Sequence, residues 1–244
     1  LYYFAVPASN PGGGNWPRTL IASNNSEEGI GVADIDNDGD LDISFSSGGV
    51  NEVKWARNPG NGTGSWSVFI IGTFSEADWP DRCAAADVNG DGRVDIIVTE
   101  ENAGGSPDAL VCWWEQPASG ATSGNWVRRT IATQYTMNSM DVGDVDKDGD
   151  IDIVLAEHRG TKRTAVWQNN GQGVFTQKSV DQGREGHLGG RLADLDADGE
   201  RGGEKAVCGI GEVQHLLRVN QHVQRDQGGH GPETRVSPGR APEI

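Results

Sequence analysis

Short apolar stretches alternate with turn-forming residues along most of the chain and predict many short β-strands. Apolar-rich runs such as Ile43–Phe45, Ile96–Val98 and Ile153–Leu155 are each followed within a few residues by Gly, Pro, Asn or Asp. Runs of this length, bounded by turn residues, are typical of strands. No segment keeps apolar residues at helical spacing for long enough to predict a helix. The pattern therefore predicts an all-β fold.

The same order of predicted strands recurs along the chain. Each unit has a short strand of small and apolar residues, an Asp-rich loop, a second apolar strand, a third strand with Trp and a last aromatic strand. The Trp-containing strands are Val53–Trp55, Val111–Trp113 and Ala165–Trp167. The Asp-rich loops begin 53, 57 and 50 residues apart. A period of about 50 residues with four strands in each unit is typical of β-propeller blades.

The units divide the chain into three parts. Residues 1–23 align without a gap with the same part of a later unit and are predicted to be the last two strands of a partial blade. Residues 24–200 are predicted to hold three blades and the start of a fourth. In residues 201–244 the pattern fails, with one strand expected at Ala206–Ile210. Gln214–Ile244 has no aromatic residue and is expected to be loop or disordered.

About four blades' worth of repeat is therefore present, and the number of blades and ring closure stay open. The first two strands of the partial blade either lie outside this chain or come from its C-terminal end. A ring closed in this way would have no open sheet edges, whereas an unclosed ring would offer edges for self-assembly.

Four nine-residue loops share the spacing D-x-D/N-x-D-G-x-x-D, which suits a metal ion. We name them loop 1 (34–42), loop 2 (87–95), loop 3 (144–152) and loop 4 (194–202). Their candidate ligands are Asp34, Asp36, Asp38, Asp40, Asp42, Asp87, Asn89, Asp91, Arg93, Asp95, Asp144, Asp146, Asp148, Asp150, Asp152, Asp194, Asp196, Asp198 and Glu200. Arg93 stands at the seventh position, where only the backbone carbonyl is needed. Calcium takes about six to eight oxygen ligands, and the Gly at the sixth position allows the sharp turn.

The charge of the chain supports bound cations at these loops. The net charge is −16, and 17 of the 36 acidic residues lie within the four loops. Without a cation such closely spaced carboxylates repel one another and raise each other's pKa. The prediction is weakest for loop 4, whose ninth residue is Gly202. The alternative for each loop is a solvated Asp-Gly turn without metal.

Composition also excludes some classes of function. An acidic chain repels phosphates, so nucleic acid is not expected as a partner. No stretch holds the roughly 18 consecutive apolar residues of a membrane span. Cys83 and Cys112 lie in predicted strands. They are expected to be buried, and a bridge between them stays open if the compartment is oxidising.

The loops and the sequence WARNPGNG (Trp55–Gly62) resemble the FG-GAP/VCBS repeat family, which is related to the propeller of integrin α-subunits. The resemblance covers roughly residues 1–200. It implies a β-propeller, often seven-bladed, with calcium in the loop that joins the first two strands of a blade. It also implies an extracellular or cell-surface protein.

Function is expected on the loops at one face of the ring. The first hypothesis is an adhesion module that binds carbohydrate or an extracellular protein, with Trp79 and Tyr135 stacking on a sugar. The second is a sugar-processing lyase or dehydratase, with Glu157, His158 and His187 as acid–base candidates. The third is a structural subunit of an extracellular fibre or sheath. The candidate loops before the first strands are Glu76–Arg82, Gln134–Asn138 and Arg184–His187, and those after the second strands are Glu100–Asn102 and Glu157–Arg159.

Overall fold

The computed structural model describes residues 1–23, 29–47, 49–74, 79–101, 107–181, 190–194, 205–209 and 216–218. The regular structure of these residues consists of 17 strands and one 3-10 turn, η1 (Ala121–Ser123). The strands are β1 (Tyr2–Phe4), β2 (Arg18–Leu20), β3 (Ile30–Ala33), β4 (Asp42–Ser47), β5 (Glu52–Arg57), β6 (Ser67–Thr73), β7 (Trp79–Ala86), β8 (Asp95–Glu101), β9 (Ala109–Glu115), β10 (Val127–Gln134), β11 (Met137–Gly143), β12 (Asp152–Glu157), β13 (Thr164–Asn169), β14 (Phe175–Asp181), β15 (Gly190–Asp194), β16 (Lys205–Gly209) and β17 (Leu216–Arg218). Within these ranges no helix has the length and apolar character needed to cross a membrane.

Three four-stranded antiparallel sheets form the centre of the molecule. We call β3–β6 blade 1, β7–β10 blade 2 and β11–β14 blade 3. In each blade, strands that follow one another in the chain are hydrogen-bonded neighbours. The pair β1–β2 lies before blade 1, and the three-stranded sheet β15–β17 follows blade 3.

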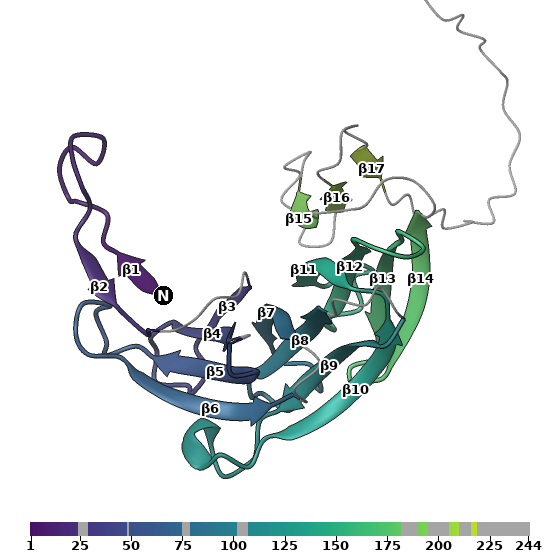
Figure 1. Ribbon diagram of the computed structural model, residues 1–244, viewed down its shortest axis with the longest axis horizontal. Helices are drawn as coiled ribbons and strands as arrows, with labels where there is room; N and C mark the ends of the chain where they lie inside the picture. The colour runs from purple at the N-terminus through teal and green to yellow at the C-terminus, as the bar shows by residue number, and fades with distance from the viewer. Residues whose placement is uncertain are drawn as a thin grey trace, which may run out of the picture.

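The sheets follow one another along an arc (Figure 1). The first strands β3, β7, β11 and β15 lie on its concave side, and β3, β7 and β11 each contact the first strand of the next sheet. The last strands β6, β10 and β14 lie on the convex side. This is the arrangement of propeller blades around a central axis. The predicted all-β, propeller-type fold is therefore confirmed.

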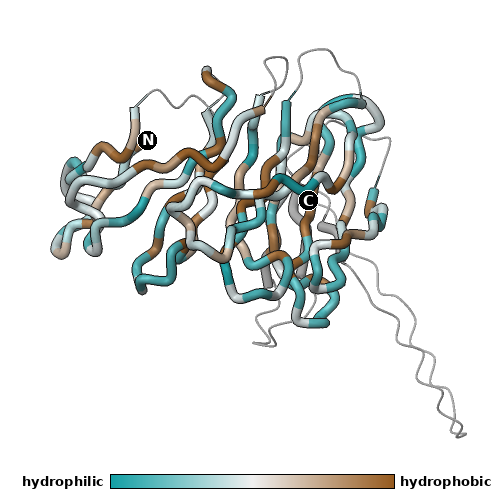
Figure 2. Tube along the Cα trace, turned by 90° about the horizontal axis from the view of Figure 1, so that it is seen from below, coloured by the Kyte–Doolittle hydropathy of each residue, from teal (hydrophilic) through white to brown (hydrophobic). Residues whose placement is uncertain are grey.

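Both faces of each blade are buried, so that the hydrophobic core is divided into layers between neighbouring sheets. In β8, Ile96 and Val98 belong to the layer shared with blade 1, whereas Ile97 belongs to the layer shared with blade 3. Successive side chains of a strand point to opposite faces, which explains this division. Figure 2 shows the hydrophobic residues mainly along the strands and the hydrophilic ones mainly at the turns.

Hydroxyl groups near the ends of the second strands also connect the blades. Ser46 Oγ donates a 3.0 Å hydrogen bond to the carbonyl of Asp81 in blade 2. Thr99 Oγ1, at the same position in blade 2, donates a 3.2 Å bond to the carbonyl of Met137 in blade 3. Each of these bonds restricts the sliding of one blade along the strands of the next blade.

Several segments expected in loops lie within strands. β7 begins at Trp79 and β8 ends at Glu101, and these two residues are paired in register. The register of the β7–β8 pair shifts between Pro80 and Cys83, and beyond this irregularity the pairing continues as far as Trp79. β12 likewise extends to Glu157. Leu216–Arg218, in the segment expected to be loop, forms β17 and pairs with β16.

Cys83 and Cys112 are buried and free. Both are paired in register with Val98, so β8 lies between them. Neighbouring strands are about 4.8 Å apart, which puts the two Cα atoms near 10 Å from each other, whereas a disulfide needs less than about 7 Å. Burial raises the pKa of the Cys83 thiol to about 12. Both cysteines therefore act as small core residues.

Candidate metal centres

Loops 1, 2 and 3 each join the first strand of a blade to its second strand. They follow β3, β7 and β11 respectively. The Gly at the sixth position has a positive φ in each loop, 97° at Gly39, 82° at Gly92 and 95° at Gly149. Side chains are strained in this region of backbone conformation, which explains the recurring Gly.

The first Asp of loops 1, 2 and 3 fixes the turn by accepting backbone hydrogen bonds. Asp34 Oδ2 accepts from the N–H of Gly39 at 2.9 Å, and Asp87 Oδ2 accepts from that of Gly92 at 2.8 Å. In loop 3 the Gly149 N–H donates to Asp144 at 3.1 Å. These bonds curl the loop around its carboxylates.

The ninth Asp of loops 1, 2 and 3 is fully buried. Asp42, Asp95 and Asp152 are all 0% exposed. One oxygen accepts from the backbone N–H at the second loop position, and the other from a backbone N–H at the end of the third strand, at distances from 2.8 to 3.0 Å. Burial raises the pKa of all three carboxyl groups, that of Asp95 to about 7. The ninth Asp thus connects the second position of its loop to the end of the third strand.

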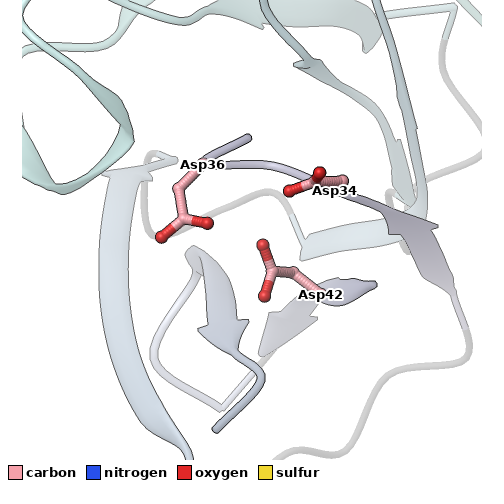
Figure 3. Close-up of side chains that lie close together, drawn as sticks. All are labelled: Asp34, Asp36 and Asp42. Atoms are coloured by element: carbon pink, nitrogen blue, oxygen red, sulfur yellow. The ribbon is translucent and has the colours of Figure 1, made fainter. Parts of the chain in front are cut away.

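Loops 1 and 3 each bring three carboxylates together. In loop 1, Asp34, Asp36 and Asp42 place one oxygen each within 4.8 Å of the others. Figure 3 shows their side chains converging on a common space. The corresponding residues of loop 3, Asp144, Asp146 and Asp152, are grouped in the same way.

One oxygen in each of these groups has no partner. Asp36 Oδ1 and Asp146 Oδ1 are buried and accept no hydrogen bond. The pKa of Asp36 is raised by burial first, and its neighbouring carboxylates add to this against the opposing effect of Arg57. The pKa of Asp146 is raised by burial and by Asp148. Buried oxygens normally have a partner, and a hard cation would supply one here. The residues present therefore fit calcium.

Two side chains at the ends of the third strands approach these groups, and sequence reasoning missed both. Arg57 Nε lies 2.7 Å from Asp36 Oδ2, and Arg57 Nη2 lies 3.0 Å from Asp38 Oδ2. In loop 3, Gln168 Nε2 donates a 2.8 Å hydrogen bond to Asp146 Oδ2. A signal was present, because each is a polar residue directly after the apolar part of a Trp-containing strand.

A comparison with known protein families agrees with this geometry. The family described as FG-GAP-like repeat matches residues 34–98 and 144–200, half of the 244 residues. Both matched segments begin at the first Asp of a loop. The chain belongs to the FG-GAP-like repeat family. None of the curated proteins matches it.

In this FG-GAP-like chain, loops 2 and 4 differ from the other two. Loop 2 has Asn89 and Arg93 at its third and seventh positions, and it forms no group of three carboxylates among the described residues. The backbone of Asp194 ends β15. Asp196, Asp198 and Glu200 lie outside the described residues.

The aromatic candidates for ligand binding lie near one rim of the blades. Trp79 is 39% exposed. Tyr135 is half-buried, and a Cβ at Gly160 would lie 2.1 Å from its Cγ, so that the ring covers Gly160. Arg159 lies 3.7 Å from Glu101 and links blades 2 and 3 at this rim. Trp79 thus offers more free surface than Tyr135.

Of the acid–base candidates, Glu157 and His158 lie within the part of the chain that the structure describes. Glu157 is 0% exposed, and its carboxylate accepts hydrogen bonds from Thr161 and Arg163. His158 is half-buried and donates its backbone N–H to the carbonyl of Thr136. His187 lies outside the described residues. A general base must reach its substrate, and the burial of Glu157 does not favour this role.

Proposed function

We propose that this FG-GAP-like protein is an extracellular β-propeller module that calcium stabilises and that binds a carbohydrate or protein partner. The observation that carries the calcium part is the pair of buried carboxylate oxygens without partners, Asp36 Oδ1 and Asp146 Oδ1. Each lies in a group of three converging carboxylates. FG-GAP-like repeats are typical of extracellular and surface proteins, which supports the location.

The role of the ion is to stabilise the fold. Each loop connects the two inner strands of a blade, and a cation that binds only the folded loop stabilises it by mass action. Free calcium at about 100 times the Kd would add about 2.7 kcal/mol for each site. Calcium sites of extracellular modules have a Kd of about 10⁻⁴ to 10⁻³ M.

Thermal unfolding with calcium and with excess EGTA tests this role. We expect calcium to raise the Tm on the order of 5–10 °C for each occupied site in a chain of this size. Magnesium at the same concentration is the control, and it should raise the Tm less because it dehydrates reluctantly. An unchanged Tm in EGTA would contradict the proposal.

A groove between blades 2 and 3 supports the binding part of the proposal. Its volume is about 520 Å³, and hydrogen-bonding side chains line it, including Asn89, Glu115, Arg128, Arg129 and Gln172. Arg129 and Glu115 form an ion pair of 2.7 Å at its side. Such a groove suits the hydroxyl and amide groups of a sugar or a protein loop better than an apolar ligand.

Binding to a panel of immobilised oligosaccharides and extracellular proteins tests the groove. The Arg129→Ala variant should lose at least tenfold in affinity for whichever panel member the protein binds. Arg18→Ala is the matched control, because Arg18 is an exposed strand arginine far from the groove, beside Tyr2. Equal affinities of the two variants would place the partner elsewhere.

A further inference from the structure

Loop 2 carries an arginine where loops 1 and 3 carry an aspartate. Arg93 occupies the seventh position, and Asp40 and Asp150 stand there in the other two loops. We infer that the guanidinium group of Arg93 takes the place of a cation in loop 2, so that this loop binds no calcium. The inference rests on the proposed calcium sites in loops 1 and 3.

The guanidinium group is held from two sides. Arg93 Nη2 forms a close ion pair with Asp91 Oδ2, the fifth position of its own loop. Arg93 Nε donates a 3.1 Å hydrogen bond to the carbonyl of Gln116, at the end of the third strand. The positive charge therefore sits beside Asp91, one of the carboxylates that a metal ion would need.

Every carboxylate oxygen of loop 2 has a donor within the protein. Asp87 accepts from the backbone N–H groups of Gly90, Asp91 and Gly92. Asp91 Oδ1 accepts from the Arg93 N–H, and its Oδ2 accepts from Asn89 and from the guanidinium group. Asp95 accepts from the backbone of Val88 and Gln116. Loop 2 thus has no counterpart of the partnerless oxygens of Asp36 and Asp146.

The charges of the loops lead to the same conclusion. Loops 1 and 3 have five aspartates each, whereas loop 2 has three and the opposing charge of Arg93. Both ends of the Asn89 amide are also engaged within the loop, because its N–H donates to Asp91 Oδ2 and its Oδ1 accepts from the Asp91 backbone N–H. A divalent ion beside a guanidinium group would be repelled, and the repulsion is strong where water is partly excluded.

Arg57 does not close loop 1 in the same way. It reaches Asp36 and Asp38 from β5, and 44% of its side chain is exposed. Asp36 Oδ1 stays without a partner although Arg57 is near. An ion in loop 1 would only have to displace an exposed side chain from another strand, whereas Arg93 belongs to loop 2 itself.

Counting bound calcium by equilibrium dialysis of full-length variants tests the inference. Asp91→Asn and Asp148→Asn change the same loop position in loops 2 and 3. We expect Asp148→Asn to lose one equivalent of calcium and Asp91→Asn to lose none. If both lose one equivalent, the inference is wrong and the calcium sites stand. If neither does, the proposed calcium site in loop 3 is wrong.

A second variant tests the inference even if Asp91→Asn fails to fold. Asn89→Asp with Arg93→Asp gives loop 2 the five aspartates of the other loops. We expect this double variant to gain one calcium equivalent and a rise in Tm with calcium that exceeds that of the unmodified protein. No gain in bound calcium would overturn the inference.

Discussion

The side-chain amide of Asn169 donates a 2.7 Å hydrogen bond to the backbone carbonyl of Val88, which lies 81 residues earlier in the loop of the preceding blade. The same Nδ2 also donates to the carbonyl of Ile151 in its own loop at 3.2 Å. Gln116 repeats the arrangement, with bonds of 2.9 Å to Ile35 and 2.8 Å to Val94. One amide thus joins the loops of two successive blades.

Replacing Asn169 should cost more stability than replacing its counterpart in blade 1. Asn58 makes comparable bonds within its blade, including one of 3.0 Å to the carbonyl of Leu41, but among the described residues it donates to no other blade. A buried carbonyl left without a donor costs about 1–3 kcal/mol. We expect Asn169→Ala to lower the free energy of unfolding by about 1 kcal/mol more than Asn58→Ala does. Urea denaturation of both variants measures the difference, and equal losses would contradict a stabilising bond between blades.

Substitution of two aspartates of loop 3 should have different effects on stability when calcium is removed. In Asp152→Asn, the new side-chain NH2 group would face a backbone N–H that now donates to the carboxylate. Two donors would then meet without an acceptor. The substitution should cost about 1–3 kcal/mol both in calcium and in EGTA. Asp146→Asn would relieve repulsion from Asp144 and Asp148, so its stability in EGTA should be unchanged or higher.

The calcium response separates the two residues further. Asp146→Asn should lose most of the rise in Tm that calcium gives to loop 3, because the partnerless oxygen is a ligand in this proposal. Differential scanning calorimetry with and without EGTA gives all four values. A loss of stability in EGTA as large as that of Asp152→Asn would show that Asp146 has a purely structural role.

Arg163 should be far more important for stability than the nearby Arg159. Arg163 makes three hydrogen bonds to the buried Glu157, two from its guanidinium group at 2.7 and 3.1 Å and one from its backbone N–H. Removing one partner of a buried ion pair costs about 3–5 kcal/mol, so we expect this loss for Arg163→Met. Arg159→Met breaks an exposed contact of 3.7 Å with Glu101 and should cost at most about 1 kcal/mol.

A second substitution shows whether the buried charge is the cause. Glu157→Gln in the Arg163→Met background should recover part of the lost stability, because it removes the unpaired carboxylate. The same denaturation experiment measures it. Similar losses for Arg163→Met and Arg159→Met would mean that Glu157 reaches solvent after all.

The contact between blades 1 and 2 leaves no room for a side chain at Gly72. A Cβ at this position of β6 would lie 2.1 Å from Cη2 of Trp114 in β9. Gly72→Ala should therefore cost about 1–3 kcal/mol through overpacking. Gly14→Ala is the control, because nothing lies within 4 Å of a Cβ there, and it should change stability by less than about 0.5 kcal/mol.

The repeat and the strand order could be predicted from the sequence because both depend on local patterns. Alternating apolar residues and the spacing of Asp and Gly within nine residues do not depend on distant contacts. The bond between Asn169 and Val88 could not be predicted in this way, since its partners are 81 residues apart. Glu157 was expected in a loop as an acid–base candidate. Its burial depends on Arg163, which only the β12–β13 turn brings against it.

The site was predicted less completely than the fold. The spacing indicated four similar loops. It could not distinguish a carboxylate that accepts backbone hydrogen bonds from one that has an oxygen without a partner. Asp42 and Asp36 are the same residue type in one loop, yet the first accepts two backbone N–H groups and the second leaves an oxygen free. The difference arises from strand ends that fold back on the loop, and these lie outside the motif.

The interface between blades 1 and 2 and that between blades 2 and 3 contain equivalent hydrogen-bonding groups. The loop of one blade presents a carbonyl at its second position, Ile35 or Val88, and the next blade presents an amide at the end of its third strand. Because these two halves recur at both interfaces, this hydrogen bond needs no new groups where one such blade follows another. Duplication or loss of a whole unit would therefore keep this hydrogen bond available where the remaining blades meet, which favours a change in the length of such a protein one blade at a time.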